Sequence, residues 1–315
     1  MSRIGYRGRF APSPTGPLHF GSLIAAFASW LRARQRNGIW LIRIEDLDPP
    51  REIAGAAEHQ LQTLAAFGLT SDEPILRQSE RGAIYEAAIQ RLLARDLAFE
   101  CRCSRSDLSD QAGIHHRCTP SDPTRVPAIR ARAPADRVEF EDRLQGRFGQ
   151  DLAREVGDFV LRRVDGWHAY QLAVVVDDAA QDITEVVRGS DLLDSTPRQI
   201  WLQSVLGLPT PEYLHLPLAL DAEGRKLSKS LAALPLDHDD PGPALRTAWT
   251  FLGQPSDRLP AHATLTALLD AAIAEFDFER VPRAARRACS RRDACVESGR
   301  GDPPRDRRVI PREGT

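Results

Sequence analysis

The first hundred residues alternate between strand-like and helix-like patterns of hydrophobic and polar positions. Residues 5–11 form a short apolar run, 22–35 repeat apolar residues at helical spacing, and 38–46 alternate between apolar and polar side chains. Residues 52–67 and 79–97 have the pattern of amphipathic helices. A strand, a helix and a second strand followed by further helices predict a βαβ unit, and therefore an α/β fold built on a parallel sheet.

The same patterns return in the second half of the chain after an interruption. Between about Phe99 and Pro134, cysteine, histidine, proline and arginine dominate, which predicts an insertion into the sheet. Beyond it, Asp165-Gly166 indicates a hairpin turn. We expect strands at 182–189 and 212–220 and helices at 196–207, 243–253 and 262–275.

The composition places few limits on function. With 315 residues, 42% of them hydrophobic, the chain can form one large or two modest domains. Its formal net charge of −2 gives no overall positive field, although basic residues can still gather on one face. The N-terminal residues lack the apolar core of a secretory signal, and no apolar run reaches the roughly 20 residues that span a bilayer. We therefore expect a cytoplasmic protein without a membrane segment.

A turn-rich stretch, PSPTGPLHFGS at residues 12–22, joins the first predicted strand to the first helix. His19 precedes a helix that begins near Gly21 and Ser22, and backbone N–H groups at a helix N-terminus favour phosphate oxygens. The histidine can donate to a phosphate, and Gly21 leaves room for an adenine ring to approach the backbone. Taken alone, the stretch can equally be an ordinary loop with a serine at the N-cap.

A second stretch, GRKLSKS at residues 224–230, follows the predicted strand at 212–220. Lys226 and Lys229 lie three residues apart with small serines beside them, in a chain whose basic residues are mostly arginine. A cationic loop of this kind can close over a triphosphate and neutralise the charge that develops in the transition state. A solvated surface turn can carry the same lysine pair, so this stretch alone does not decide the function.

Together the two stretches resemble the paired nucleotide-binding motifs of class I aminoacyl-tRNA synthetases, usually called HIGH and KMSKS. Here they are HFGS, from His19 to Ser22, and KLSKS, from Lys226 to Ser230. Each follows a predicted strand of an α/β domain, where the ligands of such folds bind. Ser22 replaces the last histidine of the HIGH pattern, so one polar contact near ATP differs from the family. The resemblance implies a Rossmann-like, doubly wound catalytic domain.

Further segments narrow the resemblance to glutamyl-tRNA synthetases. RFAPSPTG, RIEDLD, AYQLAVVVDDAAQDITEVVRGSDLLDSTPRQ and KLSKS occur in the family's order, from about Arg7 to Leu236. Within this family, the sequence is most similar to a shortened branch, the glutamyl-Q tRNA(Asp) synthetases. This similarity rests on RIEDLDPPRE, on ALPLD and on the short stretch of chain after the lysine loop. The shortened branch lacks the large anticodon-binding region of a full synthetase.

The resemblance implies a role for each matching position. The residues that would bind glutamate are Arg9, Phe10, Ala11, Pro12, Ser13, Glu45, Tyr170 and Arg188. The residues that would bind ATP are Pro12, Ser13, His19, Gly21, Ser22, Lys226, Leu227, Ser228, Lys229 and Ser230, and those with a catalytic role are His19, Lys226 and Lys229. The chemistry agrees, because two arginines and one acid match the two carboxylates and one ammonium of glutamate. Taken singly, each charged residue could belong to the surface.

Cysteines provide a separate candidate site. Three of the five, Cys101, Cys103 and Cys118, fall close together, which favours a metal site over a disulfide framework. With His115 or His116 they offer three thiolates and an imidazole, a donor set that suits tetrahedral zinc. The family places a tyrosine where His115 stands, which makes His115 the expected fourth ligand and His116 the reserve. Reduced cysteines without a metal are the alternative.

The resemblance also implies a domain plan. Residues 1–98 and 150–236 would form the catalytic domain, 99–149 an acceptor-binding insertion with one structural zinc, and 237–283 a short helical region that contacts the tRNA stem. The Arg-, Gly- and Pro-rich residues 284–315 predict a disordered tail.

The implied reaction has two steps. ATP and Mg²⁺ would convert L-glutamate to glutamyl-adenylate without tRNA, and the glutamyl group would pass to the queuosine base in the anticodon of tRNA(Asp). We expect a monomer whose local arginines hold the RNA backbone, which makes binding sensitive to salt. These arginines are Arg117, Arg125, Arg130 and Arg132.

Three other interpretations are compatible with parts of the sequence. A conventional glutamyl-tRNA synthetase would share the first step but would charge the 3′ end of tRNA(Glu). A nucleotidyltransferase of related fold would use a similar histidine loop but would not require Arg9, Glu45 and Arg188. A non-catalytic tRNA-binding protein derived from a synthetase would have no need of both nucleotide motifs.

Overall fold

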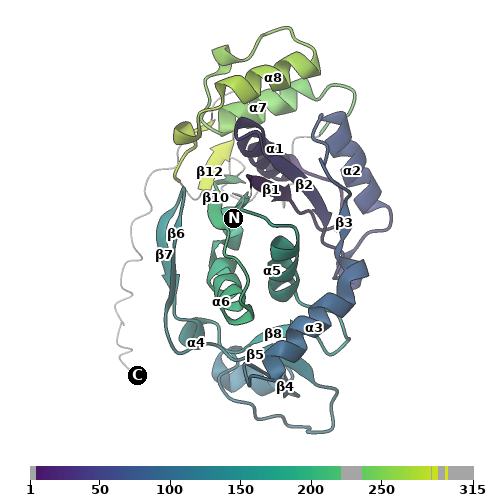
Figure 1. Cartoon of the computed structure of the whole chain (residues 1–315), viewed down its shortest axis with the longest axis vertical. Coiled ribbons are helices and arrows are strands. Elements are labelled where there is room, and N and C mark those ends of the chain that lie inside the picture. Colours follow the sequence, from purple (N-terminus) through teal and green to yellow (C-terminus); the bar gives the residue numbers. More distant parts are fainter. Residues whose placement is uncertain (1–4, 221–235, 285, 290–294, 297–315) are drawn as a thin grey trace, which may run out of the picture.

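A row of parallel strands forms the centre of the fold (Figure 1). The computed structural model describes residues 5–220, 236–284, 286–289 and 295–296. β1 pairs with β2 and β2 with β3, while β9 pairs with β10, and all of these pairs are parallel. The strands span Arg7–Phe10 (β1), Ile39–Ile44 (β2), Leu76–Arg77 (β3), Glu185–Gly189 (β9) and Glu212–Leu216 (β10). The parallel sheet and the strands predicted at 5–11, 38–46, 182–189 and 212–220 are confirmed.

The two groups of strands meet where β1 lies beside β9. The backbone N–H of Thr184 donates to the carbonyl oxygen of Arg7 over 2.9 Å, and the N–H of Arg7 donates to the Thr184 hydroxyl, also over 2.9 Å. The spatial order is therefore β3-β2-β1-β9-β10, and the direction of chain progression reverses between β1 and β9. In open α/β sheets such a reversal marks the crevice in which ligands bind.

Helices cover both faces of this sheet, because neighbouring strand residues point to opposite sides. On β9, Val187 packs in the same hydrophobic cluster as helix α1, whereas Val186 packs in a cluster that Ile200 of α6 closes. The α-helices of the described chain span Phe20–Gln35 (α1), Ala56–Ala66 (α2), Gly82–Leu93 (α3), Leu152–Glu155 (α4), Tyr170–Ala180 (α5), Thr196–Leu206 (α6), Gly242–Phe251 (α7) and Leu265–Glu275 (α8). The expected doubly wound architecture is confirmed.

Helix α1 is buried on nearly all sides, as its sequence FGSLIAAFASWLRARQ suggests. It lies between the sheet and the pair α7–α8, which Figure 1 shows at the end of the molecule farthest from β4 and β5. Phe20 meets the ring of Phe251 edge to face, with the centroids 6.4 Å apart. Helix α1, which carries the HFGS motif at its N-terminus, is therefore held in place by hydrophobic packing on both sides.

The insertion contains an antiparallel sheet of β4 (Ala98–Cys101), β5 (Ala128–Ala131) and β8 (Phe159–Arg162). The hairpin of β6 (Val138–Asp142) and β7 (Gly146–Gln150) instead joins β10 of the central sheet. The expected limits of 99–149 therefore differ from the strand pairing, which gives β8 to the insertion and the hairpin to the catalytic half. Contacts between segments that are distant in the sequence determine which strands pair. A change in amino-acid composition along the chain does not indicate these contacts.

Short 3₁₀ helices connect many of these elements. They span Pro49–Arg51 (η1), Gln78–Arg81 (η2), Ser106–Gln111 (η3), Ser190–Ser195 (η4), Ser256–Arg258 (η6) and Phe278–Arg280 (η7). An isolated bridge between Arg162 and His168 closes the turn predicted at Asp165-Gly166.

The C-terminal part carries additional strands. β11 (Leu218–Leu220) pairs in parallel with β12 (Arg286–Cys289), and β12 pairs with β13 (Cys295–Val296). The disorder expected over 284–315 stays a prediction, and the described residues of this range after Ala284 form β12 and β13. The residues around them lie outside the described part.

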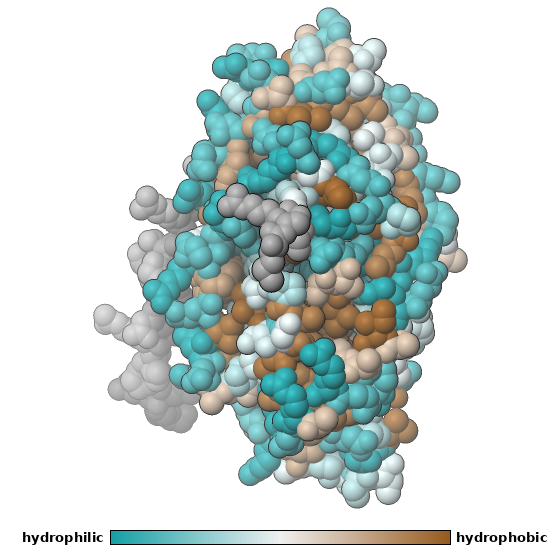
Figure 2. All heavy atoms as spheres, in the orientation of Figure 1, coloured by the Kyte–Doolittle hydropathy of each residue, from teal (hydrophilic) through white to brown (hydrophobic). Residues whose placement is uncertain are grey.

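The surface in Figure 2 is hydrophilic around its outline, with hydrophobic residues in patches across its middle. Within the described part of the chain, every helix is too short or too polar to cross a membrane.

Candidate active site

A cleft of about 1750 Å³ opens at the carboxyl ends of the central strands. The residues that follow β1, β2 and β10 contribute to its wall, in agreement with the usual ligand position in such sheets. Among its lining residues are all predicted glutamate and ATP residues that the structure describes, namely Arg9, Phe10, Ala11, Pro12, Ser13, His19, Gly21, Ser22, Glu45, Tyr170 and Arg188. The predicted lysine loop, Lys226 to Ser230, lies outside the described residues.

Arg188, on β9, is buried in the cleft wall with 5% of its surface exposed. Its Nε donates to Nε2 of His215 over 3.0 Å, and its terminal nitrogens donate to the Tyr170 hydroxyl over 3.1 Å and to the Thr196 hydroxyl over 2.9 Å. All three acceptors are neutral, and no residue in the described part of the chain places a carboxylate in salt-bridge contact with this guanidinium. A buried cation without a counter-ion is costly, so the site favours a ligand that brings a negative charge.

Arg9, on β1, is in a different electrostatic environment. Its Nε donates to Oδ1 of Asp178 over 3.0 Å, and Arg43 reaches the same oxygen over 2.8 Å. Arg43 also contacts Glu45 over 3.2 Å, so two arginines and two acids form one charge-balanced network, of which all members but Glu45 are buried. Sequence reasoning missed Arg43 and Asp178, although two adjacent aspartates at the end of the apolar run VVVDD are an available signal.

The pKa values of the two acids in this network are shifted in opposite directions. Burial raises the pKa of Asp178, but the Arg9 and Arg43 guanidiniums outweigh burial and hold this pKa below its ordinary value. Burial raises the pKa of Glu45 above its ordinary value in spite of Arg43 and Arg9. Glu45 is therefore the acid in the network that most needs a further positive partner, such as an ammonium group.

Tyr170 begins α5 and places its hydroxyl at the guanidinium of Arg188. Burial raises the pKa of Tyr170, which keeps its hydroxyl protonated near neutral pH. It can therefore accept from Arg188 and still donate to a ligand oxygen.

On the nucleotide side, His19 caps the N-terminus of α1. Its Nδ1 accepts from the backbone N–H of Ser22 over 3.2 Å, so the neutral ring carries its proton on Nε2, a donor suited to phosphate. The first turn of α1 has no acidic residue that would repel an anion. A Cβ at Gly21 would lie 3.1 Å from the His19 ring, so a side chain there would crowd the histidine.

The loop after β1 is held by backbone contacts that the sequence did not reveal. Gln60, on α2, is buried and donates to the carbonyl oxygens of Ser13 over 3.0 Å and Gly16 over 2.6 Å. The N–H of Glu45 donates to the carbonyl oxygen of Pro12 over 2.9 Å. These bonds couple the position of the nucleotide loop to that of the amino-acid residues.

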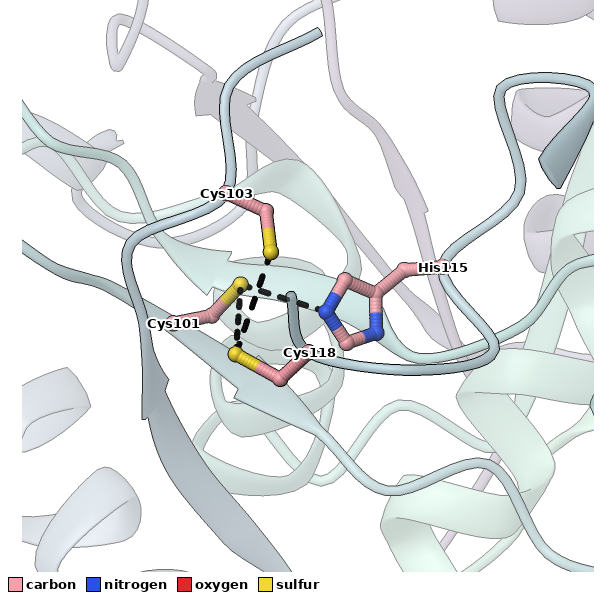
Figure 3. Close-up of side chains that lie close together, drawn as sticks. All are labelled: Cys101, Cys103, His115 and Cys118. Atoms are coloured by element: carbon pink, nitrogen blue, oxygen red, sulfur yellow. Dashed lines mark hydrogen bonds between the residues drawn. The ribbon is translucent and has the colours of Figure 1, made fainter. Parts of the chain in front are cut away.

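The predicted metal residues lie together in the insertion. Cys101, Cys103, His115 and Cys118 each offer a ligand atom, and all four atoms lie within 4.8 Å of one another. Figure 3 shows the four side chains pointing toward one another. His116 is exposed and stands outside the cluster. Three thiols and one imidazole fit the donor set of a closed tetrahedral zinc site.

The ring of His115 is oriented by a residue that sequence reasoning missed. Its Nε2 lies 3.3 Å from the Cys101 sulfur, while its Nδ1 lies 3.0 Å from a carboxylate oxygen of Asp158. Metal-bound histidines commonly donate their second N–H to a carboxylate in this way. Gly157, with φ of 69°, lets the chain pass close to His115, because a Cβ there would lie 2.5 Å from the His115 carbonyl oxygen.

The metal cluster adjoins the cleft. Cys103 and the two residues after it, Ser104 and Arg105, contribute to the cleft wall together with Arg130. Of the four arginines expected to hold RNA, only Arg130 is among these lining residues, whereas Arg125 pairs with Asp107 and Arg132 with Asp96.

Comparison with known proteins places this site in a family. Residues 6–240 match the family model of tRNA synthetases class I (E and Q), catalytic domain. A glutamyl-Q tRNA(Asp) synthetase of Xanthomonas campestris pv. campestris (strain 8004) is 61% identical over 286 residues, which cover 90% of this chain and 96% of the relative. The chain belongs to the glutamyl-Q tRNA(Asp) synthetase family.

A more distant member of this family, from Burkholderia cenocepacia (strain HI2424), is 52% identical over 294 residues, covering 89% of this chain and 99% of the relative. Among solved structures, a glutamate tRNA ligase from Elizabethkingia meningosepticum in complex with its amino acid superposes with a TM-score of 0.76. It is 28% identical, and the match covers 92% of this chain and 68% of that one. The glutamyl-Q tRNA(Asp) synthetase resemblance, the fold class and the ligase class are thereby confirmed, and enzymes of this class use ATP.

Proposed function

We propose that the protein activates L-glutamate with ATP and transfers the glutamyl group to the queuosine of tRNA(Asp). The observation that carries this proposal is Arg188, a buried cation in the cleft whose described partners are all neutral. Glutamate supplies the missing negative charge, and relatives 61% identical to this chain are named for glutamyl transfer to this tRNA.

The charges of the cleft complement those of glutamate. Arg188 and Arg9 receive its two carboxylates, and Glu45 receives its ammonium. Tyr170 donates to the carboxylate at Arg188 and walls the pocket with its ring. Phe10, Ala11, Pro12 and Ser13 form the backbone floor.

Activation joins the α-carboxylate of glutamate to the α-phosphate of ATP. A carboxylate oxygen forms the new bond to phosphorus while the bond to pyrophosphate breaks, which yields glutamyl-adenylate. His19 donates to the phosphates, and Gly21 and Ser22 admit the nucleotide at the positive end of α1. The phosphates also bind at Lys226, Leu227, Ser228, Lys229 and Ser230, where the two lysines offset the developing charge. Mg²⁺ supplies further charge neutralisation.

Cys101, Cys103, His115 and Cys118 would hold one structural zinc, with Asp158 orienting the imidazole. Bound there, zinc would stabilise the part of the cleft wall to which Cys103, Ser104 and Arg105 contribute. The helical region at 237–283 packs on α1 through α7 and α8. We infer that this region contacts the stem of the tRNA.

Glutamate activation should proceed without tRNA. The described glutamate residues are already in contact with their partners, since Arg188 bonds Tyr170 and Arg9 bonds Asp178, so no RNA is needed to assemble them. Exchange of labelled pyrophosphate into ATP with glutamate alone measures this step. A lack of exchange in the absence of tRNA would contradict the proposal. A non-catalytic RNA-binding protein would give this result, and so would a synthetase whose site requires tRNA.

Zinc should be retained at about one ion per chain and lost on removal of a ligand. Cys101→Ser and His115→Ala should release the metal, and Asp158→Asn should weaken its binding by roughly 10- to 100-fold. His116→Ala is the matched control, because this side chain stands outside the cluster. Metal analysis after dialysis against a chelator, with the thiolate absorption of a Co²⁺-substituted sample, gives both readouts. Full zinc content in Cys101→Ser would contradict the assignment.

A further inference from the structure

Two buried residues follow one another on the Nε side of Arg188. Asp142 ends β6 and His215 lies on β10, and both are at most 1% exposed. Oδ2 of Asp142 lies 2.6 Å from Nδ1 of His215, and Oδ1 accepts backbone N–H groups, including that of Gln145 over 2.8 Å. The parallel contact between β6 and β10 brings these two residues together.

This arrangement fixes the proton on the His215 ring. Asp142 remains ionised, because its hydrogen bonds from His215 and from backbone N–H groups outweigh burial and lower its pKa. Burial and the nearby Arg188 lower the pKa of His215, which keeps the ring neutral although Asp142 opposes them. A neutral ring that donates from Nδ1 to Asp142 presents a bare Nε2, and this nitrogen is the acceptor for Nε of Arg188.

The hydrogen-bond acceptors of the two cleft arginines differ in charge. Arg9 is held by the carboxylate of Asp178, which compensates its charge, whereas Arg188 is held by an imidazole that leaves its charge available. Thr196 and Tyr170 bond the terminal nitrogens, and the Tyr213 ring lies 5.5 Å from the guanidinium carbon. On the Nε side, His215 is the described acceptor of Arg188, and its Nε2 also lies 3.2 Å from the Thr196 hydroxyl.

We propose that Asp142 and His215 are positioning residues that keep Arg188 oriented and without a directly bonded carboxylate, and that they thereby set the preference for glutamate over glutamine. The inference rests on the proposed glutamate activation and adds residues that do not touch the substrate. Asp142 imposes the tautomer, His215 transmits it to Nε of Arg188, and Arg188 presents its remaining N–H groups to the carboxylate of the ligand. A glutamine amide cannot neutralise that cation.

Asp142→Asn tests the tautomer without removing the acceptor of the backbone N–H groups. The amide NH₂ of asparagine favours a proton on Nε2 of His215, which turns that nitrogen into a donor facing Nε of Arg188. We expect the KM for glutamate to rise about 10- to 100-fold with the KM for ATP unchanged, and the preference for glutamate over glutamine to narrow. Glu139→Gln, an acid-to-amide change at an exposed position of the same strand, should match the parent.

A second pair of variants keeps the test decisive if Asp142→Asn does not fold. His215→Gln retains an acceptor for Arg188 and should preserve most of the glutamate preference, whereas His215→Leu should lose it. The ¹⁵N shifts of labelled histidine give a readout independent of activity, since they distinguish a bare Nε2 in the parent from a protonated one in Asp142→Asn. Equal discrimination in His215→Gln and His215→Leu, or a protonated Nε2 in the parent, would overturn the inference.

Pyrophosphate exchange by the parent separates this inference from the proposed function. A parent without glutamate-dependent exchange would contradict the proposed function, including glutamate as its substrate. A parent with normal exchange, joined to an Asp142→Asn variant whose glutamate KM and discrimination are unchanged, would overturn only the role of Asp142 and His215.

Discussion

Arg188→Gln should reduce kcat/KM for glutamate activation by about 30-fold to several thousand-fold, because truncating a buried charge partner costs about 2–5 kcal/mol. The loss should be specific for the acid, so the variant should discriminate poorly between glutamate and glutamine. Pyrophosphate exchange at varied concentrations of both amino acids measures this. Arg147→Gln is the matched control, since Arg147 is exposed on β7 and pairs with Glu139.

The same substitution at Arg9 should have a different signature. Asp178 is buried and would keep Arg43 but lose one of its two cationic partners, so Arg9→Gln should lower thermal stability as well as activity. Arg188 has no carboxylate among its described contacts, so its replacement leaves no acid unpaired. If Arg9→Gln abolished discrimination while Arg188→Gln retained it, the roles of the two arginines would have to be exchanged.

The sequence indicated the central fold because its elements are locally encoded. The alternating pattern at 38–46 and the helical pattern at 22–35 became β2 and α1 within a few residues. The sequence does not decide the conformation of residues 170–180, since the apolar run in AYQLAVVVDD has no period that separates helix from strand, and the structure makes it α5. Burial of this run between α3 and α6, a contact between distant segments, determines its conformation.

The candidate site also contains residues that the sequence indicates and residues that it does not. Residues in recognisable motifs, such as His19, Glu45 and Arg188, were identified because they resemble a known family. Their partners were not, because Asp178 reaches Arg9 across 169 positions and Asp142 reaches His215 across 73. No local pattern encodes pairings of this length.

The metal site illustrates both cases within a small region. The close spacing of Cys101, Cys103, His115 and Cys118 predicted a cluster that the structure brings together. Asp158, which orients His115 from 43 positions away, could only be found in three dimensions. The sequence motif therefore located the cluster, and the structure supplied the residue that orients its histidine.

The volume of the cleft is relevant to the question of which molecule accepts the glutamyl group. At about 1750 Å³ the cleft exceeds the roughly 300–1000 Å³ of usual small-molecule sites, so it has room for a nucleotide base beside ATP and glutamate. The additional wall comes from the insertion, where Arg130 donates to the carbonyl oxygen of Asp158 and has no described carboxylate in salt-bridge contact. Such a cation can hold an RNA phosphate, and bases of a single-stranded loop can leave their stack to enter a pocket.

Transfer of labelled glutamate should therefore depend on the anticodon loop and not on the 3′ end of the tRNA. We expect tRNA(Asp) with queuosine to be labelled, and the same tRNA without queuosine to give no measurable transfer. Removal of the terminal adenosine should leave transfer intact, because the hydroxyl that attacks the glutamyl carbonyl, with release of AMP, belongs to the queuosine ring. Nuclease digestion followed by separation of the fragments locates the label directly. Label on the terminal adenosine of tRNA(Glu) would instead assign the protein to conventional glutamyl-tRNA synthesis, while retaining the activation step that Arg188 supports.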